Sequence, residues 1–450
     1  MPINSLHLYV RKGTDVNPSS HAPARPAACL VVLACALLVW TAVAWAGDTP
    51  AGEPCTGKDA EYHTPLAGEA QDISFLGRSI RIPPRNRDNN LAITVGGIFF
   101  HPRLGGEDAV PFAALYWRHR WEKTRARAVV SLFVNESDVA RSFGRWEFLG
   151  HLENNTIPFS QDEIADGQEV KASSIVWGTA SGWLGGGWRL PVAPFKEDND
   201  LRLQLFYHAG YLYSHRVAET GSTVQLPPDT FVHGMRFRGR YDGLRRNLLE
   251  LPHEGWAGGV DIELYRRNRW GDANYGGSLF SGDSTRDYVK FSGYLLGAMG
   301  VPWLSERNRL LASVYGGFAP GHNLDRFSAF RIGGGPFPNE TDDLWRINYP
   351  GAMFNQFPVT DYVVGTVEYR RELLFFLYLH LRETFTWANR DILTSRRLKF
   401  SEDHGQTFSV GITSGFFWKS QLYLEYAHDT GVLRNGPPGE SLLALWSKSF

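Results

Sequence analysis

The amino-acid sequence predicts an all-β fold, namely a transmembrane antiparallel β-barrel of about sixteen strands of the Gram-negative outer-membrane type. Three observations predict it: long segments alternate between apolar and polar side chains, 14% of the residues are aromatic, and an export signal stands at the N-terminus. A strand that crosses a bilayer needs about 9–11 tilted residues, whereas strands of soluble domains usually have about 5–6. The alternating segments have the longer length, which favours a membrane barrel over a soluble β-sandwich.

The composition excludes several other classes of protein. The 450-residue chain has a net charge of −1, which argues against a strongly basic nucleic-acid-binding protein, and no nucleic acid is expected as a partner. Hydrophobic residues make up 43% of the chain, too many for a disordered protein. No apolar run of about 18 residues occurs beyond the N-terminus, so a bundle of membrane-spanning helices is excluded.

The first 46 residues have the pattern of a secretory signal peptide. The apolar stretch 27–43 follows basic residues and ends in the small-x-small sequence Ala44-Trp45-Ala46. Such a segment is removed during export and takes no part in the mature fold. The alternative is an anchor helix that stays in the chain.

The mature chain is predicted to have two parts, a short periplasmic arm at 47–90 and the transmembrane barrel at 91–450. Cys55 is the single cysteine that follows the signal peptide. A lone cysteine forms no intrachain disulfide, so the exported fold must be stabilised by other means.

The alternation is clearest in two segments. In 201–213 the odd-numbered residues are Leu, Leu, Leu, Tyr, Ala, Tyr and Tyr, whereas Arg202, Gln204 and His208 share the other face. In 375–387 an apolar face broken only by Glu383 stands opposite a polar one. Lipid and lumen faces alternate in this way along the strands of membrane barrels.

We count strands back from the C-terminus. They are predicted at about 440–450, 418–428, 405–416, 375–388, 361–373, 325–333, 308–319, 285–298, 254–266, 231–241, 200–214, 173–189, 144–152, 124–135, 110–121 and 91–101. The count is sixteen, or seventeen if 173–189 splits; bacterial barrels have even numbers, and fourteen is the alternative.

The lengths of the connections predict the orientation. The turns near 373 and 417 are short, whereas the loops 334–360, 389–404 and 429–439 are long. Barrels of this type have short periplasmic turns and long external loops, so both termini are predicted in the periplasm. Cysteines placed at Asn339 and Asn435 should then react from outside the cell.

The C-terminal strand ends directly on an aromatic residue. Trp446 and Phe450 lie on one face of this strand with Lys448 between them. The ending resembles the recognition signal of outer-membrane barrels, except that Lys448 stands where an apolar residue is usual. The resemblance implies that the barrel-assembly machinery inserts this chain, with outer-membrane lipid as its surroundings.

Three motifs of the last third resemble the bacterial surface-antigen superfamily, which comprises barrel-assembly and two-partner-secretion translocases. They are FRIGGG at 330–335, LWRINYPG at 344–351 and VGTVEYR at 364–370. The resemblance implies a sixteen-stranded barrel whose sixth external loop carries an arginine motif, here Arg346 and Tyr349. The predicted loop 334–360 joins the eleventh and twelfth strands, which makes it the sixth.

The chain departs from this family in three places. Ile347-Asn348 replaces the glycine before Tyr349, the strand 379–389 lacks the aspartate that the family sets against the loop arginine, and 47–90 is too short for a POTRA domain. Three glycines at 333–335 would let the loop bend into the lumen. We predict that Arg346 enters the barrel and pairs with a lumenal carboxylate, Glu368 first; the alternative is an exposed arginine.

A charge cluster is predicted on two neighbouring strands. Arg236, Arg238 and Arg240 alternate with apolar residues, and Asp261 and Glu263 do so in the next strand. If both polar faces look inward, the charges pair across the strands. They either brace a wet interior or form a constriction that selects solutes.

Motifs of enzymes and cofactor sites are lacking in the sequence, which has no His-Glu-x-x-His, Gly-x-Ser-x-Gly, Walker loop or zinc spacing. We therefore expect no enzyme, no cofactor and no metal. The leading functional hypothesis is translocation or assembly of protein or lipid at the outer membrane. The alternatives are a passive, porin-like solute channel and a hydrolase acting at the barrel rim.

Overall fold

The computed structural model describes residues 62–82, 88–132, 135–155, 160–165, 167–194, 199–274, 279–321, 323–334, 344–352, 355–389, 391–393, 397–399, 404–434 and 436–450. The predicted signal peptide lies outside these residues, and so do Cys55, Gly335, Asn339 and Asn435.

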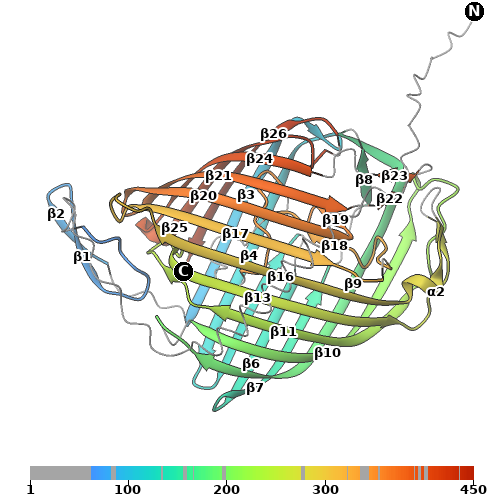
Figure 1. Cartoon of the computed structure of the whole chain (residues 1–450), viewed down its shortest axis with the longest axis horizontal. Coiled ribbons are helices and arrows are strands. Elements are labelled where there is room, and N and C mark those ends of the chain that lie inside the picture. The colour runs from blue at the N-terminus through green and yellow to red at the C-terminus, as the bar shows by residue number, and fades with distance from the viewer. Residues whose placement is uncertain are drawn as a thin grey trace, which may run out of the picture.

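Sixteen antiparallel strands close into one barrel, and the last strand pairs with the first (Figure 1). In chain order they are β3 (Asn89–Leu104), β4 (Glu107–Trp121), β5 (Thr124–Ser131), β6 (Asn135–Phe143), β7 (Trp146–Asn154), β9 (Gln168–Pro191), β10 (Asp200–Arg216), β11 (Thr230–Asp242), β13 (Pro252–Arg267), β16 (Asp287–Gly300), β17 (Asn308–Phe318), β20 (Asp361–Leu374), β21 (Leu377–Asn389), β24 (His404–Ser414), β25 (Ser420–Asp429) and β26 (Gly439–Ser449). Two short strands, β8 (Gln161–Ala165) and β12 (Arg245–Arg246), add to β9 and β13. The predicted fold class and strand number are confirmed.

The two faces of the wall differ as the alternation predicted. Leu205 and Tyr207 of β10 are each 51% exposed on the outside, whereas His208 faces the lumen and is 5% exposed. In β21 the outward Phe385 is 54% exposed and the inward His380 is fully buried. An apolar outer face can meet lipid, and the polar inner face satisfies its groups with one another.

Two strand predictions were wrong. The segment 325–333 gives only β18 (Phe330–Ile332), which pairs with β19 (Phe357–Val359) in a separate two-stranded sheet. Strand β6 was missed, because Ser137 and Arg141 interrupt its outward face and hide the alternation. One strand was predicted in excess and one was missed, so the number of strands is still sixteen. The segment 173–189 does not split, because it lies in the single strand β9.

The connection 319–360, which we call the sixth loop, joins β17 to β20. These are the eleventh and twelfth strands of the barrel, so the predicted rank of the loop holds, although the loop begins earlier than expected. Its buried residues pack with lumenal side chains of the wall into one apolar core, and the interior of this part of the barrel is therefore filled.

The ends of the barrel differ in the length of their connections. At one end, the turn end, β4–β5, β6–β7 and β20–β21 are joined by two-residue turns. At the other, the loop end, lie the sixth loop, the hairpins β14 (Ala273–Asn274) with β15 (Leu279–Phe280) and β22 (Asp391–Leu393) with β23 (Arg397–Lys399), and the helix α2 (Gly282–Thr285).

An N-terminal hairpin lies beside the turn end. It consists of β1 (Gln71–Phe75) and β2 (Arg78–Ile82), and it projects beyond the barrel in blue at the left of Figure 1. The barrel chain enters at β3 and leaves at Phe450 on this same side. Among the described residues no helix is long and apolar enough to cross a membrane.

Candidate functional site

The sixth loop folds back into the lumen, and its base shows why. After β18, Gly333 and Gly334 have φ angles of 137° and 63°, a region that residues with a side chain rarely adopt. The backbone N–H of Tyr349 then donates to the carbonyl oxygen of Gly334 at 3.0 Å. Ile347 and Tyr349 are 7% and 1% exposed, so the segment 344–352 of the loop is part of the core.

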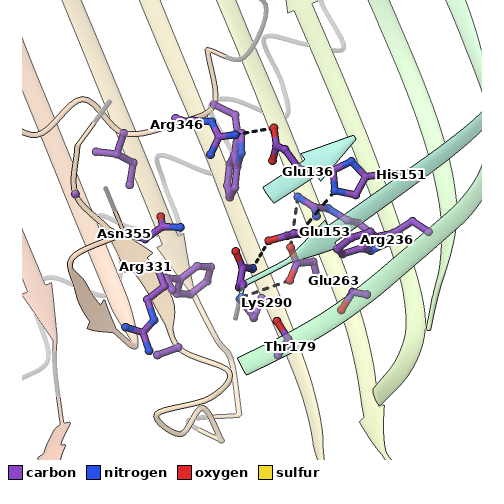
Figure 2. Close-up of a pocket in the computed structure, with 18 of the residues that line it drawn as sticks. Glu136, His151, Glu153, Thr179, Arg236, Glu263, Lys290, Arg331, Arg346 and Asn355 are labelled. Carbon is purple, nitrogen blue, oxygen red and sulfur yellow. Dashed lines mark hydrogen bonds and ion pairs between the residues drawn. The ribbon is translucent and has the colours of Figure 1, made fainter. Parts of the chain in front are cut away.

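Arg346 reaches the far wall of the barrel. Its Nη2 donates to Oε1 of Glu136 on β6 at 2.7 Å, and each side chain is 9% exposed. Nη2 of Arg127 on β5 donates to the same carboxylate oxygen at 2.6 Å. Figure 2 shows the pair between Arg346 and Glu136 at the edge of the cavity. Arg346 thus enters the lumen and pairs with a lumenal carboxylate, but the prediction of Glu368 as that carboxylate was wrong.

Glu368, the predicted partner, is already enclosed by two arginines and a histidine. Nε of Arg370 lies 2.8 Å and Nε of Arg382 2.7 Å from its carboxylate oxygens, and Nδ1 of His380 lies at 2.8 Å. Arg382 also donates to Glu425 of β25. Arg382 of β21 therefore pairs with Glu368, the acceptor that we predicted for Arg346 of the loop.

Sequence reasoning missed this buried network, and counting along the chain would not have found it. Glu368 and Arg382 stand opposite each other in the pairing of β20 with β21. Counting outward from the two-residue turn between these strands would pair Glu368 with Glu383 instead. A bulge between Glu372 and Leu374 shifts the register by one residue, and it also brings Arg370 opposite His380.

Tyr349 fixes the loop to the opposite side of the barrel. Its hydroxyl donates to Oδ1 of Asp429 at 3.4 Å and accepts from Oγ1 of Thr407 at 3.2 Å. Close by, a Cβ added to Gly351 would lie 3.2 Å from Cβ of Ala427. The sixth loop thus spans the lumen from β6 on one side to β24 and β25 on the other.

The predicted charge cluster is brought together on β11 and β13. Asp261 accepts from Nε of Arg236 at 3.0 Å, from Nε of Arg238 at 3.3 Å and from Nη2 of Arg240. Arg236 also lies 3.6 Å from Glu263. One buried carboxylate therefore serves three guanidinium groups.

The sixth loop packs on this cluster. The ring of Trp345 lies 5.8 Å from Cζ of Arg236 and 5.9 Å from Cζ of Arg240. Cations over an indole face are attracted by its negative π surface. Lys290 of β16 extends the cluster, with Nζ 3.4 Å from Glu263 (Figure 2).

Within the described residues, two cavities of the lumen border the loop. The larger, of about 640 Å³, lies between the loop and the wall from β3 to β16 and includes the charge cluster. The smaller, of about 270 Å³, lies on the side of β17 to β26 and is lined by Glu368 and Arg382. Leu344 and Arg346 line both cavities, so the loop separates them.

The turn end is covered by two further segments. The connection 243–251 carries Arg246 and Asn247, which are 3% and 1% exposed. Residues 62–68 of the arm bind to it, since Leu66 forms a β-bridge with Asn247 and the N–H of Ala67 donates to the carbonyl oxygen of Arg246 at 3.0 Å. The arm therefore lies across the mouth of the barrel.

Polar and aromatic contacts hold the arm. The hydroxyls of Tyr62 and Thr64 both donate to Glu372, the latter at 2.7 Å, and Cζ of Arg307 lies 4.0 Å from the Tyr62 ring centroid. Burial and the neighbouring carboxylate of Glu372 raise the pKa of Tyr62, which keeps its hydroxyl a donor. Phe75 of the hairpin packs edge-on against Phe375 at 5.8 Å.

The C-terminal residues close the barrel. The N–H of Phe450 donates to the carbonyl oxygen of Leu91 at 2.9 Å, beyond the last pair of β26 with β3. Trp446 and Phe450 are 44% and 62% exposed on the outer face. Within the described part of the chain, no group of three His, Cys, Asp or Glu side chains could hold a metal ion.

Comparison with solved structures relates the fold to known barrels. CdiB from Acinetobacter baumannii matches with a TM-score of 0.51 at 10% identity, covering 86% of this chain and 66% of its own length. BamA from Haemophilus ducreyi lacking POTRA domains 1–3 gives 0.47 at 10% identity, with 85% and 75% covered. The outer membrane channel DcaP of Acinetobacter baumannii gives 0.39 at 9%, with 80% and 96% covered. No protein-family model and no curated protein matches the chain.

These observations define the class of protein as an outer-membrane β-barrel, with an apolar outer face, a polar lumen and a closed antiparallel wall. The sixteen strands and the long sixth loop agree with the fold that the resemblance to the surface-antigen superfamily implies.

Proposed function

We propose that this barrel is a gated translocation pore of the bacterial outer membrane, through which a protein or lipid segment passes when the sixth loop moves aside. The observation that carries the proposal is the crossing of the lumen by this loop, from Glu136 to Asp429. Sixteen-stranded barrels with an empty lumen form aqueous channels, and this crossing divides the lumen into two cavities instead.

The contacts of the loop suit a gate. The segment 344–352 is held in the lumen by the ion pair of Arg346, the hydroxyl contacts of Tyr349 and the stacking of Trp345 on arginines, none of which is a backbone hydrogen bond of the wall. The first part of the loop is held more firmly, because Asp325 and Arg326 form buried ion pairs with Arg267 and Glu163, so we assign the movement to 344–352. Moving the loop would leave the sixteen strands paired. A passive solute channel, the alternative from the sequence, would require an unobstructed path through this filled interior.

A reversible lock tests the gate. Cysteines at Gly351 and Ala427 would place their Cβ atoms about 3.2 Å apart, slightly below the usual disulfide spacing of about 3.5–4.5 Å. The new Cβ at position 351 would also lie 2.5 Å from Oγ of Ser441, so the pair is combined with Ser441→Ala. In a Cys55→Ser background, the oxidised Gly351→Cys/Ala427→Cys variant should hold the loop in the lumen. The two single-cysteine variants under the same oxidant are the controls.

The functional readout is the composition of the outer membrane. A strain without this barrel should lose particular proteins or lipids from its surface, and the wild-type chain should restore them. The double-cysteine variant should restore them only under reducing conditions. Full restoration by the oxidised, locked barrel would exclude transport through the lumen, and an unchanged surface in the deletion strain would exclude translocation altogether.

A further inference from the structure

The larger cavity contains, besides the charge cluster around Asp261, a row of positive charges near the turn end. Arg189, Arg202 and Arg240 stand directly beside one another on β9, β10 and β11. Like charges in directly opposed positions of a sheet destabilise it unless anions offset them. Asp200 accepts from Nε of Arg189 at 2.6 Å and from Nε of Arg202 at 2.5 Å, and Asp261 accepts from Arg240.

Next to this row, Arg238 lines the cavity with its guanidinium group. Its Nε donates to Asp261 at 3.3 Å, its Cζ lies 5.5 Å from the ring centroid of Phe206, and its side chain is 21% exposed. Among the described residues its two terminal nitrogens have no hydrogen-bond partner, although the carboxylate of Asp138 also attracts the charge of this guanidinium. A guanidinium fork of this kind donates two parallel hydrogen bonds to an oxyanion.

Gln204 completes the arrangement. It stands directly opposite Arg238 in the pairing of β10 with β11, beside Arg202 on the same face. Its amide has no hydrogen-bond partner within the described part of the chain, and Gln204 lines the larger cavity. The amide nitrogen can therefore donate to an oxygen atom of a ligand there.

We propose that Arg238 and Gln204, flanked by Arg202 and Arg240, bind a phosphate group of a ligand that enters the larger cavity. Donors from two neighbouring strands surround the position, which suits a tetrahedral oxyanion carrying two charges. The cavity volume of about 640 Å³ lies within the usual range for ligand sites. Its lining reaches Glu107 and Glu169 near the loop end, which gives the route of entry. This site would exist whether or not the barrel translocates a substrate.

The test measures binding of inorganic phosphate to the full barrel in detergent by calorimetry. Wild type should bind saturably, and Arg238→Gln should weaken binding about tenfold or more, the loss expected for a hydrogen bond to a charged group. The control is Arg103→Gln, which changes an exposed arginine paired with Asp108 at the loop end. Heat-modifiable migration on gels confirms that each variant is folded.

A second variant keeps every arginine. Gln204→Glu would place a carboxylate beside Arg238 and occupy the site from within, so it should abolish phosphate binding without loss of the fold. Two further binding experiments use glycerol phosphate and micelles that contain phosphatidic acid. Tighter binding of glycerol phosphate would indicate a soluble ligand, and tighter binding of phosphatidic acid would indicate a lipid headgroup. Failure of wild type to bind any of the three, equal binding of acetate, or normal binding by Gln204→Glu would overturn the proposal.

Discussion

Arg346 of the sixth loop and Glu136 of β6 form an ion pair at 2.7 Å in the lumen, although 210 positions separate them in the chain. Glu136 also accepts from Arg127, so the wall holds this carboxylate in place before the loop arrives. The pair therefore anchors the segment that we propose to move to a fixed acceptor.

Removal of the loop anchor should loosen the gate. Arg346→Ala removes the charged hydrogen bond to Glu136, while Glu136 keeps Arg127, so we expect a loss of about 1.5–3 kcal/mol in loop attachment rather than unfolding. Planar-bilayer recordings should show higher or more frequent conductance. Arg266→Ala, which changes an exposed arginine at the loop end, should behave as wild type. Unaltered conductance and protease resistance in Arg346→Ala would show that the pair is not an anchor.

The wall network should be more sensitive than the loop anchor. Arg382→Ala would leave Glu368 and Glu425 buried without their shared cation, a loss of about 3–5 kcal/mol for a broken buried pair. The neighbouring Glu383 faces outward and stands opposite Val367 and Phe408, so Glu383→Gln should be neutral or stabilising. Urea unfolding of the two variants in detergent measures the difference. Equal stability of both would refute the assignment of the two faces.

Attachment of the arm should depend on pH through Glu306 in the turn between β16 and β17. Burial raises the pKa of this carboxyl, but hydrogen bonds from His253 and His63 of the arm outweigh it and lower the net value. A lowered carboxyl pKa stabilises the folded state above the ordinary value of about 4.3, and this contribution disappears as the pH falls through the folded value.

We therefore expect the thermal unfolding midpoint of wild type to fall on acidification below about pH 4.3 more steeply than that of Glu306→Gln. The variant lacks the titrating group, and it is the matched control. Parallel curves for the two proteins would show that Glu306 makes no such contribution.

The orientation of the barrel is open to direct labelling. Glu219 lies exposed in the connection between β10 and β11 at the loop end, and Trp303 is 95% exposed at the turn end. In a Cys55→Ser background, Glu219→Cys should react with an impermeant maleimide on whole cells, whereas Trp303→Cys should react only after lysis. The reverse result would place the loop end in the periplasm.

The terminal residue should matter for assembly. Phe450 extends the seam between β26 and β3 by one hydrogen bond and exposes its ring to the outer face. Deletion of Phe450 should lower the amount of heat-modifiable barrel in the outer membrane, whereas Phe450→Tyr should retain it. Wild-type levels after deletion would mean that the terminal aromatic residue is incidental.

The sequence by itself determined the barrel, because alternation with a period of two assigns each residue of a strand to lipid or lumen whatever its neighbours are. It placed Arg238 and Asp261 together for the same reason, since adjacent antiparallel strands bring such residues into register. It failed for β6, where polar residues on the outward face conceal the period.

Only the tertiary structure decided what the sixth loop touches. Local pattern says that Arg346 can turn inward after Gly333 and Gly334, but not which wall it meets. Glu368 is the nearer carboxylate in sequence, yet Arg370 and Arg382 already neutralise it from within the sheet. Arg346 meets Glu136 because closure of the barrel places strands that are distant in the chain on opposite sides of one lumen. Patterns within a single segment of sequence do not show which strands lie opposite each other.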